Sequence, residues 1–117
     1  MPGYPEDDPP ENYGGGPGSS GGTLLSQTLS SSNCAYLRLN QIVGPDEVAD
    51  LAHRMGVTTE LHPEYSSMAL GSDGVSPLDM AVAYATLAND GVRNDPYLID
   101  RVEEADGGIV IAHEAAP

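Results

Sequence analysis

The chain has 117 residues, with four arginines and no lysine against 18 acidic residues, and its formal net charge is −14. A chain of this length forms one domain at most. Nucleic acid is not expected as a partner, because binding to phosphates requires a basic footprint and the arginines are scattered along the sequence. No apolar run approaches the roughly 18 residues of a membrane span, and the N-terminus lacks the basic and apolar regions of an export signal. We therefore expect no membrane contact by the chain as given.

Cysteine and histidine give little sign of a reactive or metal-binding site. Cys34 is the only cysteine, and we expect it to act as a small buried apolar residue because no base is predicted beside it. The histidines His53, His62 and His113 are far apart and have no partner at i, i+4. This spacing predicts no metal site, and nothing in the sequence implies a cofactor.

Residues 1–22 consist mainly of proline, glycine, serine and acidic residues. Such a composition buries too little apolar area to offset the entropy lost on ordering. We interpret this segment as a flexible arm, with Tyr4 and Tyr13 as its docking points. The folded part is expected to run from residue 23 to residue 117.

Two short apolar segments flank a polar step at residues 30–33, with the sequence Ser-Ser-Ser-Asn. Thr23 is expected to cap a short helix before the step, and a second helix is expected to run from the step to Val43. Serine and asparagine favour caps and turns over helix interiors, so the step alone predicts a plain N-cap. The apolar stripe of the second helix is expected at Ala35, Leu39, Ile42 and Val43.

A third helix is predicted from Pro45 to Met55, followed by Gly56 as a left-handed C-terminal cap. Residues 57–75 lack periodicity and predict a long connection, with an extended piece at residues 67–70. The acidic residues of this connection are Glu60, Glu64 and Asp73. They could pair as a catalytic acid and base, but we favour the interpretation that they are ordinary surface charges.

The last elements are a helix and a hairpin. Ser76, Pro77 and Asp79 form a helix start with a capping box. The helix runs to about Asn89 and is apolar on nearly every side, which predicts burial. Strand-like runs at 97–102 and 109–112 flank a turn at 105–108. The fold class predicted is α+β, with three helices, a loop, a buried helix and a C-terminal β-hairpin.

From Asn12-Tyr13 to about Val110, the chain resembles the transpeptidase domain of class A penicillin-binding proteins. The resemblance rests on four stretches in the family's order: 23–33 with its S-x-N motif, 44–57, 67–91 with "LGS" and "PLDMAVAYATLAN", and 96–110. It implies a penicillin-binding/β-lactamase-like fold, of which this chain holds mainly the helical part and the hairpin. The central sheet would be largely missing.

The resemblance also implies roles for two residues. These enzymes use a serine nucleophile in S-x-x-K, an S-x-N loop and a K-T-G strand. Ser31 matches the serine that relays protons to the lysine amine, and Asn33 matches the amide that orients the substrate's acyl group. Ser32 is the free middle position. The chain has no lysine, so S-x-x-K is expected before residue 1 and K-T-G after residue 117, and the chain alone is expected to be inactive.

The interpretation favoured here is a central fragment of a peptidoglycan D,D-transpeptidase. Its partners would be stem peptides and β-lactams, and the parent protein would face the cell wall outside the bacterial cytoplasmic membrane. A non-catalytic acidic interaction module is the main alternative. A third interpretation is a β-lactamase fragment, which would share the S-x-N motif but not the apolar helix at 77–89.

Overall fold

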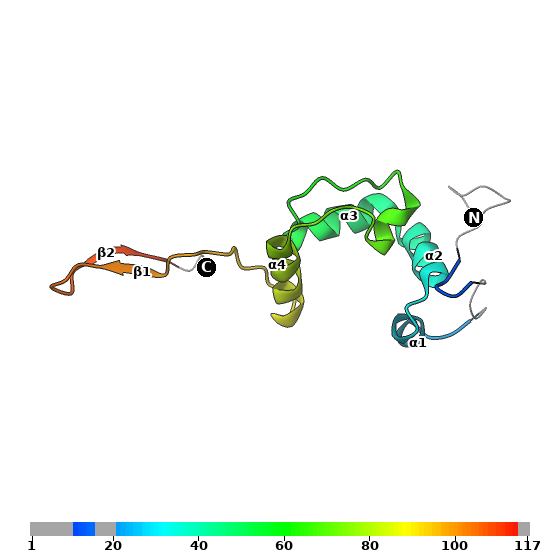
Figure 1. Cartoon of the computed structure of the whole chain (residues 1–117), viewed down its shortest axis with the longest axis horizontal. Helices are drawn as coiled ribbons and strands as arrows, with labels where there is room; N and C mark the ends of the chain where they lie inside the picture. The colour runs from blue at the N-terminus through cyan, green and yellow to red at the C-terminus, as the bar shows by residue number, and fades with distance from the viewer. Residues whose placement is uncertain (1–10, 16–20, 115–117) are drawn as a thin grey trace.

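The computed structural model describes residues 11–15 and 21–114. It is a small mixed structure of helices and a two-stranded antiparallel sheet (Figure 1). In chain order the elements are α1 (Leu24–Leu29), α2 (Asn33–Val43), α3 (Pro45–Arg54), the 3-10 helix η1 (Ser66–Leu70), α4 (Pro77–Ala88), β1 (Arg101–Glu103) and β2 (Ile109–Ala112).

Three helices begin at side-chain caps. The hydroxyl oxygens of Thr23, Ser32 and Ser76 accept hydrogen bonds from backbone N–H groups in the first turns of α1, α2 and α4. Each bond satisfies an amide that has no partner within its helix. The helix starts predicted at Thr23 and Ser76 are therefore confirmed, and the serine step is confirmed as the joint between α1 and α2.

Gly56 ends α3 and brings it against α4. Its φ is +114°, its N–H donates to the His53 carbonyl at 3.0 Å, and the Val57 N–H donates to the Ala52 carbonyl at 3.1 Å. This pair of bonds is a Schellman motif. A Cβ on Gly56 would lie 2.5 Å from Cγ1 of Val82. Glycine is thus required both for the backbone conformation and for the close approach of α4.

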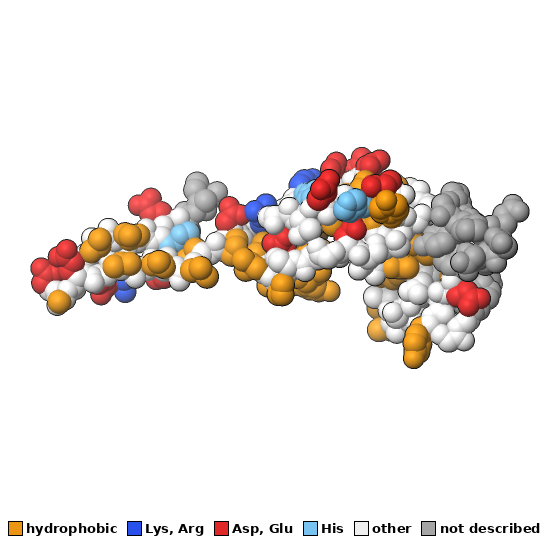
Figure 2. All heavy atoms as spheres, turned by 45° about the horizontal axis from the view of Figure 1, so that its top comes forward, with side chains coloured by type: hydrophobic (Ala, Val, Ile, Leu, Met, Phe, Trp, Pro, Cys, Tyr) orange, Lys and Arg blue, Asp and Glu red, His pale blue; other side chains and the backbone are white. Residues whose placement is uncertain are grey.

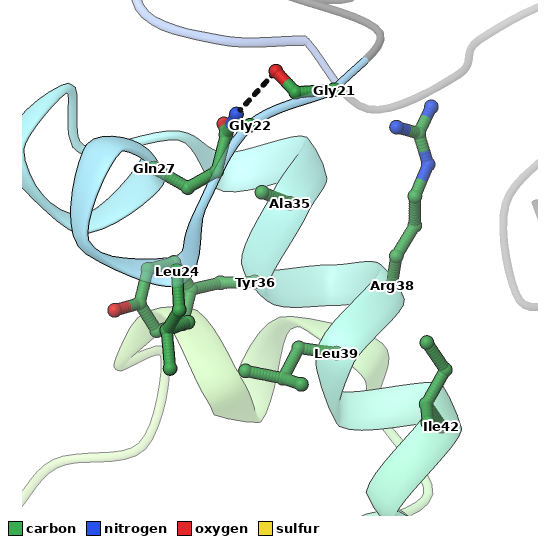
Figure 3. Close-up of a pocket in the computed structure, with 9 residues that line it drawn as sticks. All are labelled: Gly21, Gly22, Leu24, Gln27, Ala35, Tyr36, Arg38, Leu39 and Ile42. Atoms are coloured by element: carbon green, nitrogen blue, oxygen red, sulfur yellow. Dashed lines mark hydrogen bonds between the residues drawn. The ribbon is translucent and has the colours of Figure 1, made fainter.

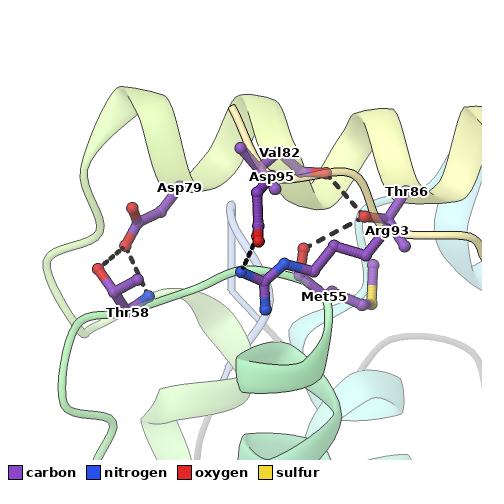
Figure 4. Close-up of polar contacts among 7 residues, drawn as sticks. All are labelled: Met55, Thr58, Asp79, Val82, Thr86, Arg93 and Asp95. Carbon is purple, nitrogen blue, oxygen red and sulfur yellow. Dashed lines mark hydrogen bonds and ion pairs between the residues drawn. The ribbon is translucent and has the colours of Figure 1, made fainter. Parts of the chain in front are cut away.

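Polar bonds also connect α4 to the segment that follows α3 (Figure 4). The Thr86 hydroxyl lies 3.3 Å from the Met55 carbonyl, and the Asp79 carboxylate accepts two bonds from Thr58. Farther along the chain, Arg93 pairs with Asp95 at 2.6 Å. The bonds of Asp79 and Thr86 therefore hold α4 along the side that is buried.

The core lies where α2, α3 and η1 meet. Leu37 is its most enclosed side chain, at 1% exposure. Cys34 is buried there, as predicted. The buried apolar residues are Cys34, Leu37, Ala49, Val57, Met68, Val82 and Ala83.

The predicted apolar stripe of α2 is wrong. The helix buries Cys34, Leu37 and Asn40, whereas Ile42 is 82% exposed and Val43 is also exposed. The reason is that α2 packs against η1 and α3, and the face that is buried carries Leu37 together with Cys34 and Asn40. Sequence periodicity found a stripe, but the packing partner selected a different face.

Two further expectations are corrected. Residues 66–70 form a 3-10 helix and not an extended piece, closed by the Gly71 N–H on the Met68 carbonyl at 2.9 Å. The helix α4 is not buried all round, since only Asp79, Val82, Ala83 and Thr86 are buried. Figure 2 shows hydrophobic side chains gathered over α4 and along the hairpin; on α4 they include Leu78, Met80, Tyr84 and Leu87.

The predicted C-terminal hairpin is confirmed, but its first strand is shorter than the predicted run 97–102, because β1 begins only at Arg101. β1 pairs with β2 in antiparallel register, with Val102 opposite Ile111. The Gly107 N–H donates to the Glu104 carbonyl at 3.0 Å, and the register shifts beside this turn, as in a hairpin with a bulge. Figure 1 shows the hairpin projecting from the helices, in a structure of 71 × 27 × 25 Å. Its radius of gyration, 19.9 Å, exceeds the about 13 Å of a compact domain of this size.

Part of the predicted arm contacts the helices, but not through the expected side chain. Tyr4 lies outside the described residues, and Tyr13 is fully exposed. Glu11 and Asn12 instead bond to the start of α2. Among residues 11–15 and 21–114, no helix is long and apolar enough to cross a membrane.

Candidate functional site

Ser31 stands at the joint between α1 and α2 in an unusual backbone conformation. Its N–H donates to the Thr28 carbonyl at 3.0 Å, and the Ser32 N–H donates to the Gln27 carbonyl at 3.1 Å. These bonds close α1 and place Ser31 at φ +51°. A left-handed residue with a Cβ costs about 1–2 kcal/mol. Such strain is concentrated at functional sites. Ser31 is exposed, and its hydroxyl makes no hydrogen bond to a described residue.

Ser32 is not a free middle position. Its side chain is 7% exposed, and its hydroxyl oxygen accepts from the Ala35 N–H at 3.3 Å. The same hydroxyl donates to Oδ1 of Asn12 at 3.4 Å. Ser32 therefore caps α2, and the sequence expectation for it is corrected.

Asn33 is the first residue of α2, and the capping role in this step belongs to Ser32. Nδ2 of Asn33 donates to the Glu11 carbonyl at 3.2 Å. An amide nitrogen carries two hydrogens, so a second N–H and the amide oxygen remain for another group. Asn33 can therefore bind a peptide through its second N–H and its amide oxygen, while its first N–H is bonded to Glu11.

Ser31 and Asn33 border the same surface depression, of about 300 Å³. On one side, the Tyr36 and Thr28 hydroxyls lie 2.5 Å apart. The other side comes from η1 and is apolar. The full lining is Thr28, Ser31, Ser32, Asn33, Tyr36, Ala69 and Leu70. The two predicted site residues are therefore brought together, with hydroxyl and amide groups on one wall and apolar groups on the other.

Asn12 is the residue that sequence reasoning missed. Its Oδ1 accepts from the Ser32 hydroxyl at 3.4 Å and from the Cys34 N–H at 3.3 Å. Cys34 is 22 positions away along the chain, so no local pattern could reveal the contact. The one available signal was the start of the family resemblance at Asn12-Tyr13.

A second depression, of about 290 Å³, lies between α1 and the outer side of α2 (Figure 3). The predicted stripe residues Ala35, Leu39 and Ile42 line it together with Leu24. Nε2 of Gln27 donates to the Gly21 carbonyl at its edge, at 3.2 Å. The apolar face that periodicity identified is thus an open surface and not part of the core.

Two histidines and one of the loop acids take part in local structure. Nδ1 of His53 donates to the Val57 carbonyl at 2.8 Å. Asp73 accepts from the His62 N–H at 2.9 Å and lies 3.2 Å from its ring Nδ1. Asp73 therefore organises the long loop. Within the described part of the chain, no group of three or more His, Cys, Asp or Glu side chains is placed to hold a metal ion.

Comparison with protein families matches residues 3–116 to the penicillin binding protein transpeptidase domain. The match includes the segment that holds Glu11 and Asn12.

Comparison with individual proteins finds the same similarity. The chain is 34% identical over 101 residues to penicillin-binding protein 2D of Bacillus subtilis, covering 86% of this chain and 14% of that protein. It is 33% identical over 102 residues to penicillin-binding protein 1A of Escherichia coli, covering 86% and 12%. It is 30% identical over 106 residues to penicillin-binding protein 2a of Streptococcus pneumoniae, covering 89% and 14%. The chain therefore spans only a small part of the length of these relatives.

Proposed function

The chain belongs to the family of penicillin-binding protein transpeptidase domains, and we propose that it supplies the S-x-N segment of a peptidoglycan D,D-transpeptidase. In this proposal the parent protein acts on stem peptides, is acylated by β-lactams, and works on the outer side of the bacterial cytoplasmic membrane. The names of the relatives support the penicillin-binding part of the proposal.

The proposed chemistry is acyl transfer through a serine ester. A nucleophilic serine attacks the stem-peptide carbonyl and releases the terminal amine, and a second stem peptide's amine then takes the acyl group. Serine is a weak nucleophile unless a neighbouring base takes its proton. The 117 residues contain no lysine, so the S-x-x-K and K-T-G motifs are contributed by other parts of the protein. The chain alone is then inactive.

Ser31 and Asn33 have different roles in this scheme. The Ser31 hydroxyl passes a proton between the lysine amine and the leaving amine. The Asn33 amide donates to the acyl group of the peptide and fixes its orientation. Holding the reacting groups in place lowers the barrier without new covalent chemistry.

The observation that carries the proposal is the backbone conformation and the exposure of Ser31. It is exposed, held at φ +51°, without a hydrogen bond from its side chain to any described residue, and borders the same depression as Asn33. A residue needed only to close α1 could be glycine, which adopts this left-handed conformation without the cost of a Cβ.

Two measurements test the proposal. The coding sequence on either side should contain S-x-x-K upstream and K-T-G downstream; their absence would favour the acidic interaction module. In the full-length protein, Ser31→Ala should slow β-lactam acylation, whereas Ser30→Ala should not. Ser30 is a matched control because it is also exposed and its hydroxyl donates only to the Gln27 carbonyl, at 3.2 Å. Equal rates for both variants and the wild type would contradict a relay role for Ser31.

A further inference from the structure

We infer that Asn12 is a positioning residue for the S-x-N segment, and that Glu11 and Asn12 together fix the orientation of the Asn33 amide. This inference rests on the proposed function. It assigns a role to a segment that precedes the S-x-N motif by about twenty positions.

The contacts bracket Asn33 on both sides. Oδ1 of Asn12 accepts from the Ser32 hydroxyl and from the Cys34 N–H, at 3.4 and 3.3 Å. Between them, the Glu11 carbonyl accepts from Nδ2 of Asn33 at 3.2 Å. Three consecutive residues are thus bound by two neighbouring ones. Ser31, immediately before them, makes no such bond and stays open to the depression.

Asn12 completes the cap of α2 from a distant part of the chain. The first N–H groups of a helix have no partner within it. The N–H of Cys34, the second residue of α2, donates to Asn12. The N–H of Ala35, the third residue, donates to Ser32. Since the Ser32 hydroxyl also donates to Asn12, both capping groups belong to one hydrogen-bonded unit. Movement of Asn12 would therefore be transmitted to the start of α2.

A tight turn holds the Asn12 side chain in place. The Gly15 N–H donates to the Asn12 carbonyl at 2.9 Å, and Gly14 between them has a φ of +90°. Residues other than glycine rarely adopt this conformation. The sequence Asn-Tyr-Gly-Gly thus closes a turn that directs Asn12 toward α2, while Tyr13 points away into solvent.

The consequence for Asn33 is a defined direction for its free N–H. The Glu11 carbonyl engages one of the two amide hydrogens, so the second hydrogen and the amide oxygen are left for the substrate in a single orientation. Without this bond the amide would rotate about its side chain, and a misplacement of about 1 Å can slow a reaction about a hundredfold.

The test compares three variants of the full-length protein by β-lactam acylation rate, at a temperature where all of them are folded. Asn12→Ala removes the acceptor and should slow acylation about ten- to hundredfold. Asn12→Asp keeps an acceptor oxygen for both donors and should retain a rate within about threefold of the wild type. Tyr13→Ala is the control and should not change the rate. A wild-type rate for Asn12→Ala, or rates explained by the unfolded fraction alone, would overturn the inference.

A parallel measurement separates this inference from the proposed function. If Ser31→Ala reacts at the wild-type rate, the proposed function fails, and hydrogen exchange of the Cys34 amide in the full-length protein then tests the bond to Asn12 itself. Faster exchange in Asn12→Ala than in Asn12→Asp supports the positioning contact. Equal exchange in the two variants overturns it.

Discussion

Oδ2 of Asp79 accepts two hydrogen bonds from one residue, the Thr58 N–H at 2.7 Å and the Thr58 hydroxyl at 2.8 Å (Figure 4). The two residues are 21 positions apart, so the contact joins the loop after α3 to the first turn of α4. The Thr58 backbone N–H and, after it, the Thr58 hydroxyl lower the pKa of Asp79 below its ordinary value of 3.8. The capping-box acid predicted from sequence thus serves a long-range contact.

This contact predicts loss of stability in acid. The pKa of Asp79 is lower in the folded chain than in the unfolded chain. The ionised carboxylate therefore stabilises the fold at pH values above the pKa of the unfolded chain. That contribution is lost as the pH falls below 3.8 through the folded pKa. Asp79→Asn should therefore weaken the loss of helix content as the pH falls below 3.8, measured by circular dichroism. An acid transition as steep in the variant as in the wild type would contradict this.

Ser31 and Ser32 should have opposite effects on stability. Ser31→Gly relieves the left-handed backbone and should raise the free energy of unfolding by up to about 1 kcal/mol. Ser32→Ala removes the cap of α2 and should lower the free energy of unfolding by about 1 kcal/mol. Urea unfolding followed by far-UV circular dichroism measures both. The prediction is wrong if the two variants shift the midpoint in the same direction.

The exposed apolar surface of α4 and the hairpin predicts weak cooperativity in the chain studied alone. Helical circular dichroism should be present together with binding of a hydrophobic dye, because tertiary packing encloses only one side of α4. Heating should give a broad transition. A sharp transition without dye binding would show that these apolar groups are enclosed in solution.

The 117-residue chain should form no covalent adduct with penicillin. The motivation is the absence of lysine, which leaves no serine with a lysine amine to activate it. Intact-mass measurement after incubation with a β-lactam decides the matter. A stoichiometric acyl adduct would show that the nucleophile lies within these residues.

Local signals predicted the helices and the hairpin well, because their causes lie within a few residues. Two helices begin at the caps Thr23 and Ser76, and α3 ends at Gly56. The bonds at these helix ends join residues only three to five positions apart. The hairpin likewise depends on a turn between adjacent runs. These are the features for which neighbouring residue types carry enough information.

Burial and the support of the site were not predictable in the same way. Which face of α2 is buried depends on η1, some thirty positions later in the chain, so the more apolar stripe at Ile42 was chosen wrongly. The bonds of Asn12 to Ser32 and Cys34 also join residues that are 20 and 22 positions apart in the sequence. Ser31 and Asn33 were identified through the family resemblance and remain proposed site residues.

The most direct test of the proposed site is the β-lactam acylation rate of the full-length protein with Asn33→Asp. Aspartate is well tolerated at the start of a helix, where it interacts favourably with the helix dipole, but it loses the bond to the Glu11 carbonyl. Thermal stability should therefore fall only slightly. Aspartate lacks the amide N–H and places a charge beside the reacting centre. Acylation should therefore slow by the equivalent of about 2–4 kcal/mol. A variant that is acylated at the wild-type rate, or only in proportion to its unfolded fraction, would contradict a substrate-binding role for Asn33.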